Sequence, residues 1–271
     1  MLAIAAHPDD LELACGGTLA KFVDSGHEVQ ELVMSDGERG GNVEARCGEA
    51  RRGASFLGLA GLQHFSFTDA DLAGHAQEMI QEIEAAIARF KPDIILTHSH
   101  HDYHQDHQAV HAATLRAARR HSSILCYESP SATREFDPCV FVDIDDYVEA
   151  KVQAVLMHGD QRDKPYMAAE RLRGIAIFRG AQARRKVAEA FEPVRMLATE
   201  MGSFEAESIG RRVIAVHPES SRESRRSALN QTCWEAALPK QPMPYGEQLA
   251  RMDWDQDRAG ARPEDTDHAN R

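Results

Sequence analysis

Residues 1–24 of the chain are MLAIAAHPDDLELACGGTLAKFVD, and this stretch carries the strongest signal for the fold. The apolar run from Leu2 to Ala6 has the length of a buried strand, and residues 18–24 have the apolar spacing of a helix. Gly26 suits the left-handed residue that ends such a helix. Because a buried strand followed by a helix is the repeating unit of a parallel sheet, the stretch predicts a βαβ fold.

The same alternation continues along the chain to about residue 191. We expect further strands at residues 29–34, 62–67, 93–97, 124–127 and 140–144. We expect further helices at residues 44–57, 78–90, 108–120, 145–157 and 167–191. The predicted fold class is therefore α/β, with a mostly parallel, Rossmann-like sheet flanked by helices.

The composition divides the chain near residue 204. Residues 1–204 are predicted to form one α/β domain, and residues 205–271 a polar, proline-containing, irregular C-terminal extension. Its composition is typical of a mobile tail, but it holds both tryptophans, Trp234 and Trp254, which favour docking on the domain or on a second subunit. A docked and a partly mobile extension both stay open, as does a homo-oligomer.

Charge and cysteine spacing exclude several classes of protein. The 271 residues include 31 Lys and Arg against 43 Asp and Glu, so the net charge of −12 repels polyanions and we expect no nucleic-acid partner. The five cysteines are scattered without any C-x-x-C pair, which fits neither a disulfide framework nor a thiolate zinc site. No apolar run reaches the length of a signal peptide or a membrane span. We therefore expect a cytoplasmic protein.

Histidine is the unusual residue type in this chain. Six of the 14 histidines fall between positions 98 and 111: His98, His100, His101, His104, His107 and His111. They follow the predicted strand at 93–97, just as His7 follows the strand at 2–6. Because parallel strands of an open α/β sheet present their carboxyl ends at one edge, where active sites lie, both groups point to metal or proton chemistry at that edge.

The first of these groups is His7-Pro8-Asp9-Asp10. An imidazole nitrogen and one carboxylate can bind a divalent metal, while the neighbouring carboxylate stays free to face a water molecule. The alternative is structural, since Pro-Asp-Asp is also common in turns and helix N-caps.

The second group is Asp102-Tyr103-His104-Gln105-Asp106-His107. It can supply a metal ligand, a second imidazole as acid or electrophile, and carboxylates that orient the rings. Which histidine binds a metal stays open: His107 and His111 could also chelate an ion across one helical turn, although no glutamate lies beside them as a base. A histidine-rich surface loop without a defined function is the plainer alternative.

The glycines argue against a nucleotide site. Gly16-Gly17 precedes a predicted helix, but without a G-x-G-x-x-G or P-loop pattern it favours close helix packing over phosphate binding. The loop from Gly37 to Gly41 is either the rim of a substrate cleft or a long turn. A G-x-S-x-G elbow is also missing, so the sequence does not support a serine nucleophile.

Taken together, the two motifs resemble the LmbE-like (PIG-L) family of zinc-dependent N-deacetylases. The resemblance rests on HPDDLE at 7–12 with Gly16-Gly17-Thr18, on the loop at 35–38, on Arg46-x-x-Glu49 and on the D-x-H-x-D-H run at 102–107. It covers roughly the first 200 residues and leaves the extension unexplained. It implies that residues 1–204 are a catalytic domain.

The resemblance implies a metal site and a base. His7, Asp10 and His107 would hold the cofactor, Zn²⁺, with Fe²⁺ or another divalent metal as the alternative. Asp9 would be the general base that takes a proton from the attacking water.

It also implies roles around that site. His104 would act as the protonated imidazole that stabilises the oxyanion and helps the amine to leave, with its charge supported by Asp106. Arg46 would line the substrate pocket, and Asp102 would give a supporting hydrogen bond. The family commonly has proline where this chain has Gln105, which we expect to change loop stiffness more than chemistry.

The implied activity is hydrolysis of the acetamide of an N-acetylglucosamine-type sugar or glycoconjugate, a small-molecule partner. The sugar and its aglycone stay open. The alternatives are an amidase of the same fold that acts on another N-acyl group or a thiol conjugate, and a sugar-binding protein that has lost the chemistry. A nucleotide-binding Rossmann module is disfavoured by the missing glycine pattern.

Overall fold

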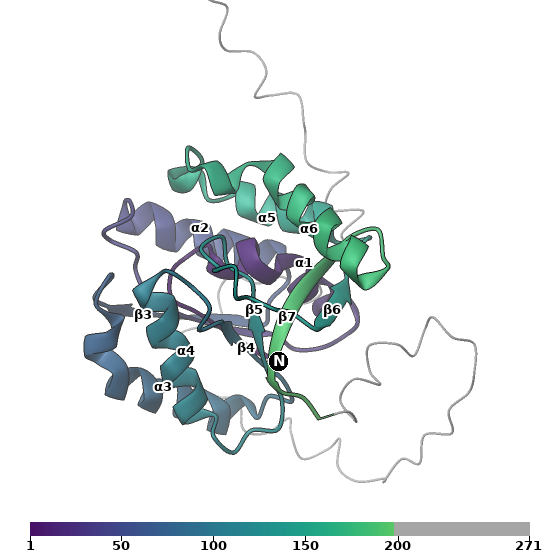
Figure 1. Cartoon of the computed structure of the whole chain (residues 1–271). Helices are drawn as coiled ribbons and strands as arrows, with labels where there is room; N and C mark the ends of the chain where they lie inside the picture. Colours follow the sequence, from purple (N-terminus) through teal and green to yellow (C-terminus); the bar gives the residue numbers. More distant parts are fainter. Residues whose placement is uncertain (198–271) are drawn as a thin grey trace, which may run out of the picture. The chain divides into compact units, whose positions relative to one another are not determined.

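The computed structural model describes residues 1–197 and shows a seven-stranded sheet in the order β3-β2-β1-β4-β5-β7-β6 (Figure 1). The strands are β1 Leu2–Ala5, β2 Gln30–Ser35, β3 Gly61–Phe67, β4 Ile95–His98, β5 Ile124–Tyr127, β6 Val140–Asp143 and β7 Ala188–Arg195. The α-helices are α1 Asp10–Asp24, α2 Val43–Phe56, α3 Ala76–Phe90, α4 Gln105–Ala117, α5 Val148–Leu156 and α6 Ala169–Ala183. Short 3-10 helices lie at Leu72–His75, Gly159–Gln161 and Pro165–Met167.

The sheet is parallel from β3 to β5, and β7 is antiparallel to both β5 and β6. Strand β1 pairs with β2 on one side and with β4 on the other, with Ala3 opposite both Glu31 and Leu96. The order therefore reverses between β1 and β4, which is the position where open α/β sheets form a crevice beyond their carboxyl ends. The α/β prediction with a mostly parallel sheet is confirmed.

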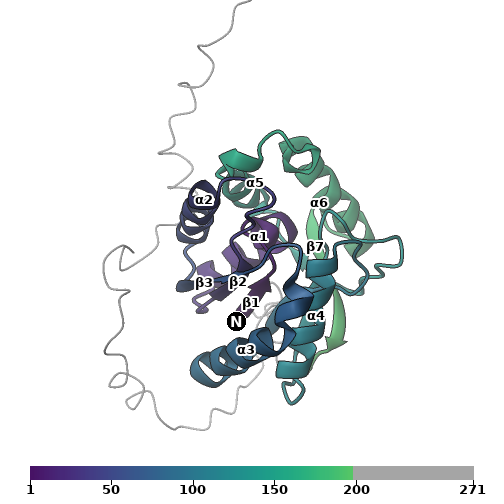
Figure 2. The ribbon, with the colours of Figure 1, turned by 90° about the vertical axis from the view of Figure 1, so that its left-hand side faces the viewer.

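Helices cover both faces of the sheet. Figures 1 and 2 show α3 and α4 together on one face and α1, α2, α5 and α6 on the other. On the first face, Ile4 and Ile95 of the sheet pack in one buried cluster with Met79 and Ile83 of α3 and with Val110 of α4. This apolar packing holds β1 and β4, the two strands that lead into the candidate site. None of the helices within residues 1–197 combines the length and apolar character needed to cross a bilayer.

Helix α1 begins earlier than the sequence suggested. It runs from Asp10 rather than Thr18, with non-helical backbone angles at Cys15. Gly17 lies against Ile144, the residue that follows β6: a Cβ at position 17 would come within 2.8 Å of Ile144 Cδ1. This contact agrees with the close-packing interpretation of Gly16-Gly17.

The helix predicted at 167–191 is wrong in its last part. Helix α6 ends at Ala183, where Arg184 adopts left-handed angles (φ 59°), and the chain returns as strand β7. The strand was not predicted because Glu189, a charged residue, interrupts the apolar run by which a buried strand is recognised. The structure accounts for it: its carboxylate accepts from the backbone N–H groups of Gly17 and Thr18 and pairs with Lys151 Nζ at 2.6 Å.

The predicted extension at 205–271, with Trp234 and Trp254, and the boundary at residue 204 lie outside the described residues.

Candidate active site

The turn after β1 and the histidine-rich segment after β4 meet in space. Asp10 bridges them, with Oδ2 3.5 Å from His7 Nδ1 and Oδ1 3.4 Å from His107 Nε2. The ring of His104 lies 4.8 Å from that of His7 and 4.5 Å from that of His107, measured between centroids. The three expected metal ligands are therefore neighbours, although 97 residues separate Asp10 from His107 in the sequence.

Backbone geometry fixes the turn. The N–H groups of Ala6 and His7 donate to Asp10 Oδ2 at 3.1 and 2.8 Å, which leaves Oδ1 free to face His107. Asp9 has φ 116°, a region that residues other than glycine rarely enter and that costs about 1–3 kcal/mol. Asp9 immediately precedes helix α1, which begins at Asp10, and its side chain makes no capping hydrogen bond to the helix.

Asp102 contacts the His107 ring, and the supporting role implied for it stays a prediction. Its Oδ2 lies 2.9 Å from His107 Nδ1, and its carboxylate also accepts hydrogen bonds from Ser129, from Ser131 and from the backbone N–H of His104. With Nδ1 bonded in this way, His107 presents Nε2 to Asp10. Burial opposes protonation of His107, but Asp10 and Asp102 outweigh it and raise its pKa to about 9.

His7 contacts two further carboxylates besides that of Asp10, one of which is Asp106, expected beside His104. Its Nε2 lies 3.0 Å from Asp69 Oδ1 and 3.2 Å from Asp106 Oδ2. Burial opposes protonation, yet Asp10, Asp106 and Asp69 together hold the pKa of His7 well above its usual value. The Asp106 carboxylate contacts His7 Nε2 and accepts hydrogen bonds from the backbone N–H groups of Ala70 and Leu72. Its contact with the ring of His104 is through the backbone N–H of Asp106 and not through the carboxylate.

Two residues of this cluster received no role from the sequence: His98 was named only as one of six clustered histidines, and Asp69 was not named. His98, the last residue of β4, places Nε2 3.2 Å from Asp10 Oδ2, and burial together with neighbouring His107 lowers its pKa to about 4. Its position at the end of a buried strand was the available signal. Asp69 follows β3 as a single carboxylate without a motif, so nothing local distinguished it.

The donor set fits a divalent cation. Three overlapping groups each place their ligand atoms within 4.8 Å of one another: His7, His104 and His107; Asp10, His98 and His107; and His7, Asp69 and Asp106. Imidazole and carboxylate are the ligands that zinc and iron accept in hydrolytic sites. The predicted ligands His7, Asp10 and His107 are divided between the first two groups, which share His107.

His104 caps helix α4. Its Nδ1 accepts the backbone N–H of Asp106 at 3.2 Å, so a neutral ring carries its hydrogen on Nε2. Burial, then His107 and His7, lower the pKa of His104. This geometry makes Nε2–H a donor on the side of the cluster. The protonated form expected from the resemblance stays a prediction.

Asp9 and Arg46 form a buried pair beside the histidines. The Arg46 guanidinium donates to the carbonyls of Gly37 and Pro8 at 2.7 and 3.0 Å and lies 3.4 Å from Asp9 Oδ1. Burial and the charge of Asp10 raise the pKa of Asp9 to about 6, although Arg46 opposes the shift. A carboxyl group with this pKa can exchange protons near neutral pH.

The loop at 35–41 wraps around this arginine. Gly37 has φ 66°, and a Cβ there would collide with Arg46 Nη1. The loop is therefore more than a long turn, because its backbone holds the guanidinium that contacts Asp9.

A further buried pair lies behind Asp9. His158 Nε2 is 3.1 Å from Glu12 Oε1, and the positive charge of His158 lowers the pKa of Asp9. His158 follows helix α5 as an isolated histidine, and no sequence pattern connected it to the site.

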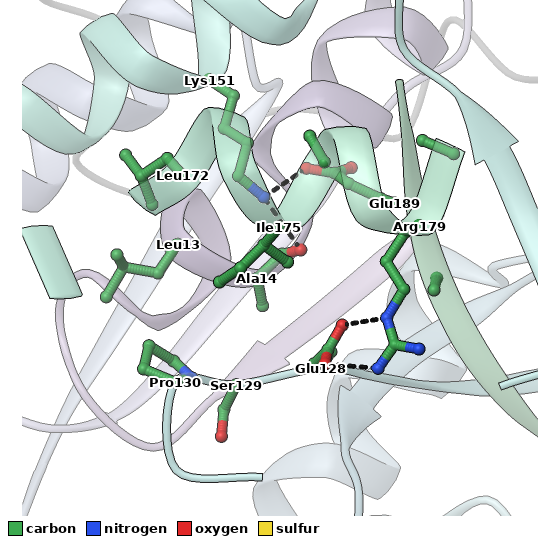
Figure 3. Close-up of a pocket in the computed structure, with 13 residues that line it drawn as sticks. Leu13, Ala14, Glu128, Ser129, Pro130, Lys151, Leu172, Ile175, Arg179 and Glu189 are labelled. Atoms are coloured by element: carbon green, nitrogen blue, oxygen red, sulfur yellow. Dashed lines mark hydrogen bonds and ion pairs between the residues drawn. The ribbon is translucent and has the colours of Figure 1, made fainter. Parts of the chain in front are cut away.

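A pocket on the α1, α5 and α6 side of the sheet contains none of the predicted site residues (Figure 3). Apolar residues of its wall include Leu13, Pro130, Leu172 and Ile175. Its charged groups are already paired: Lys151 with Glu189, and Arg179 with Glu128, each at 2.6 Å. Ser129, which donates to Asp102, is its link to the histidines. The residues predicted to carry the chemistry therefore lie in the histidine cluster and not in the wall of this pocket.

Comparison with known proteins places these residues in a family pattern. The family model described as GlcNAc-PI de-N-acetylase (PIG-L) matches residues 2–118, which contain the predicted metal, base and histidine positions. An uncharacterized deacetylase of Escherichia coli K12, YaiS, is 35% identical over 165 residues, which are 58% of this chain and 89% of the relative. Diacetylchitobiose deacetylase of Thermococcus kodakarensis is 30% identical over 217 residues, 70% of this chain and 80% of the relative.

Solved structures share the fold. The conserved protein TT1542 from Thermus thermophilus superimposes with a TM-score of 0.64 at 25% identity, covering 72% of this chain and 94% of that one. The 4-carboxy-2-hydroxymuconate hydratase GalB of Pseudomonas putida has a TM-score of 0.61 at 21% identity, covering 73% and 96%. Because a hydratase shares the fold, the fold by itself does not determine the reaction.

Proposed function

The chain belongs to the PIG-L (LmbE-like) deacetylase family, and from this premise we propose that it is a metal-dependent hydrolase that removes the N-acetyl group from an N-acetylglucosamine-type sugar or glycoconjugate. The observation that carries the proposal is that the Asp10 carboxylate lies between two imidazoles, 3.5 Å from His7 Nδ1 and 3.4 Å from His107 Nε2, with Asp9 next to it in the sequence. The products are acetate and a free amine.

His7, Asp10 and His107 would hold the cation, and His98 and Asp69 lie close enough to adjust its surroundings. When bound, a divalent cation such as Zn²⁺ supplies a Lewis acid that lowers the pKa of water and polarises a carbonyl. Two of the proposed ligands are oriented by other groups: Asp10 by backbone N–H groups, and His107 by Asp102.

Asp9 is the general base in this proposal. It lies next to the ligand Asp10 in the sequence, it is buried, and its pKa of about 6 allows it to be ionised at neutral pH and still accept a proton. Arg46 contacts the same carboxylate and keeps it oriented. We also assign to Arg46 a position at the substrate pocket, as the family resemblance implies.

His104 stabilises the oxyanion that forms when water attacks the acetyl carbonyl. The backbone bond at Nδ1 leaves Nε2–H as the donor, and loss of one such donor typically costs about 2.7–4 kcal/mol of transition-state stabilisation. Protonation of the ring at Nδ1, which would break the bond from the Asp106 N–H, would let Nε2–H give its proton to the leaving amine. Asp106 acts on this ring through the α4 N-cap and on His7 through its carboxylate.

The test is acetate release from a panel of N-acetylglucosamine glycosides that includes N,N′-diacetylchitobiose and N-acetylglucosaminyl inositol, with other N-acylated glucosamines beside them. Asp9→Asn is expected to lower kcat by about 10²–10⁴-fold while the protein keeps its metal. His107→Ala is expected to lose the metal held by His7, Asp10 and His107, and with it the activity. His100→Gln, which changes an exposed histidine of the same segment outside every ligand group found within residues 1–197, is the matched control and keeps both.

Three outcomes would overturn parts of the proposal. Undiminished turnover by Asp9→Asn removes Asp9 as the base. Release of a longer acyl group but no acetate makes the chain an amidase of another specificity. Sugar binding with a full complement of metal and no amine product makes it a non-catalytic binding protein.

A further inference from the structure

A second group of metal-binding side chains lies away from the histidines already described. Asp36 follows strand β2, Cys47 lies in helix α2 and His64 lies in strand β3. We call these three residues the Cys47 cluster. They come from three separate elements, so no sequence spacing connected them.

The distances within the Cys47 cluster match a tetrahedral site. Cys47 Sγ lies 3.4 Å from Asp36 Oδ1 and 3.8 Å from His64 Nε2, and Asp36 Oδ1 lies 3.3 Å from His64 Nε2. Zinc bonds of about 2.3 Å to sulfur and about 2.0–2.1 Å to nitrogen or oxygen, at tetrahedral angles, would put sulfur about 3.6 Å from the other two atoms and nitrogen about 3.3 Å from oxygen. The three ligand atoms therefore already stand at the corners of such a site.

Hydrogen bonding accounts for only part of this arrangement. His64 Nε2 faces the Ser35 carbonyl oxygen at 2.9 Å as well as Asp36 and the thiol of Cys47. The Cys47 thiol donates to Asp36 Oδ1, and a neutral imidazole has at most one hydrogen on Nε2, which cannot serve both the Ser35 carbonyl and the Asp36 carboxylate. A cation among them would meet sulfur, nitrogen and oxygen at once, with the Ser35 carbonyl as a further oxygen.

The ligand types select the class of cation. A thiolate with an imidazole and a carboxylate suits a borderline-soft ion such as Zn²⁺, whereas Mg²⁺ and Ca²⁺ prefer sites built from oxygen alone. The His64 side chain is 8% exposed and that of Asp36 22%, so an ion can reach the cluster from solvent and still be largely enclosed. The thiolate and the carboxylate together balance the charge of a divalent ion.

We propose that Asp36, Cys47 and His64 form a second divalent-metal site of the zinc class, separate from the site of His7, Asp10 and His107. The two are linked through neighbours: Asp36 precedes Gly37, and Cys47 follows Arg46, whose guanidinium donates to the Gly37 carbonyl. An ion in the Cys47 cluster would therefore clamp the loop at 35–41 to helix α2, next to the arginine that contacts Asp9.

Cobalt distinguishes the two sites without any measurement of activity. The purified full chain, stripped of metal with a chelator, is titrated with Co²⁺ while its near-ultraviolet spectrum is recorded. Only a cobalt–thiolate bond gives an intense charge-transfer band there, and the first site contains no cysteine. We expect two cobalt ions per chain and a thiolate band that saturates with one of them.

Variants assign the band to the cluster. Cys47→Ser is expected to bind one cobalt ion without the band, and His107→Ala to keep the band. Cys139→Ser, which changes an exposed free cysteine, is the control and keeps both ions and the band. If circular dichroism shows that Cys47→Ser does not fold, His64→Gln is titrated in its place. The cobalt affinity measured from the thiolate band is expected to fall by at least about 10-fold in this variant. A wild-type protein without the band, or a band that persists in Cys47→Ser, overturns the proposal.

Discussion

Asp9 shows how single residues of this chain are adapted to chemistry. Asp9 has a left-handed backbone and a buried carboxylate, and it lies between the proposed ligands His7 and Asp10. Each of these features would be unfavourable in a purely structural turn. Such strain persists where the surrounding structure enforces it, and it is concentrated at functional sites. A purely structural role of the His7–Asp10 turn leaves this strain unexplained, whereas the proposed roles, with Asp9 as the base and Asp10 as a metal ligand, account for it.

Arg46 is expected to set the pH range in which Asp9 works. A base acts only when ionised, and the positive charge of Arg46 lowers the pKa of Asp9 and so extends activity to lower pH. Removing the charge in Arg46→Met raises that pKa, so the acid limb of the kcat/KM profile should move to higher pH by about 1 unit or more. Arg52→Met, an exposed arginine of the same helix, should leave the limb in place. A limb that moves downward or stays unchanged in Arg46→Met contradicts the assignment.

For single residues, a local motif was enough to predict which of them lie close together, while their roles stay predictions. His7, Asp10, Asp102 and His107 belong to two short runs, and the structure brings these runs together. Asp69 and His158 are single residues that reach the site through the tertiary fold, over sequence distances that no local pattern reports.

At the scale of elements, the alternation of apolar runs located β1 to β6 and most helices correctly. It failed at β7. A strand is recognised in a sequence by buried apolar residues, and β7 includes Glu189, a charged residue that is nevertheless buried in an ion pair with Lys151. Helix α6 ends at Ala183, and the next residue, Arg184, adopts a left-handed conformation. Glycine usually occupies such a position, and an arginine there gives no signal of a helix end in the sequence.

The close contact between α6 and the start of β7 makes a specific prediction. A Cβ at Gly180 would come within 2.5 Å of the backbone oxygen of Lys186, so Gly180→Ala should lower the free energy of unfolding by about 1–3 kcal/mol. Gly174 lies in the same helix with nothing within 4 Å of its Cβ position, so Gly174→Ala should instead raise stability by about 0.5–1 kcal/mol. Urea unfolding of both variants tests the pair. Equal stability of the two variants would show that Gly180 does not lie this close to the backbone of Lys186.

At the scale of the whole molecule, the topology explains why the site exists. Strands β1 and β4 are neighbours at the point where the strand order reverses, and each delivers one half of the histidine cluster. Many carboxylates are buried near that point, and burial, Glu12 and Asp10 raise the pKa of Glu31 well above its usual value. A bound cation would offset part of this concentration of negative charge.

Metal removal should therefore destabilise the folded chain. Zinc at 1,000 times its dissociation constant stabilises a folded state that alone binds it by about 4.1 kcal/mol. Thermal unfolding of Cys47→Ser, which isolates the first site, should show a Tm that rises with zinc, and the double variant Cys47→Ser/His107→Ala should lose most of that rise. A zinc-dependent Tm unchanged by His107→Ala would place the ion elsewhere.

The extent of the domain, the extension at 205–271, the cytoplasmic location and the oligomeric state stay predictions of the sequence. The fold class and the family are established, but the fold is shared with a hydratase, so the reaction has to be argued from the site.

The most direct test is an anomalous difference map at the zinc edge from crystals of the full chain grown with zinc. The account expects a strong peak bonded at about 2.0–2.2 Å to side-chain atoms of His7, Asp10 and His107. A map with no peak among these three residues, recorded from protein that still releases acetate, would contradict it.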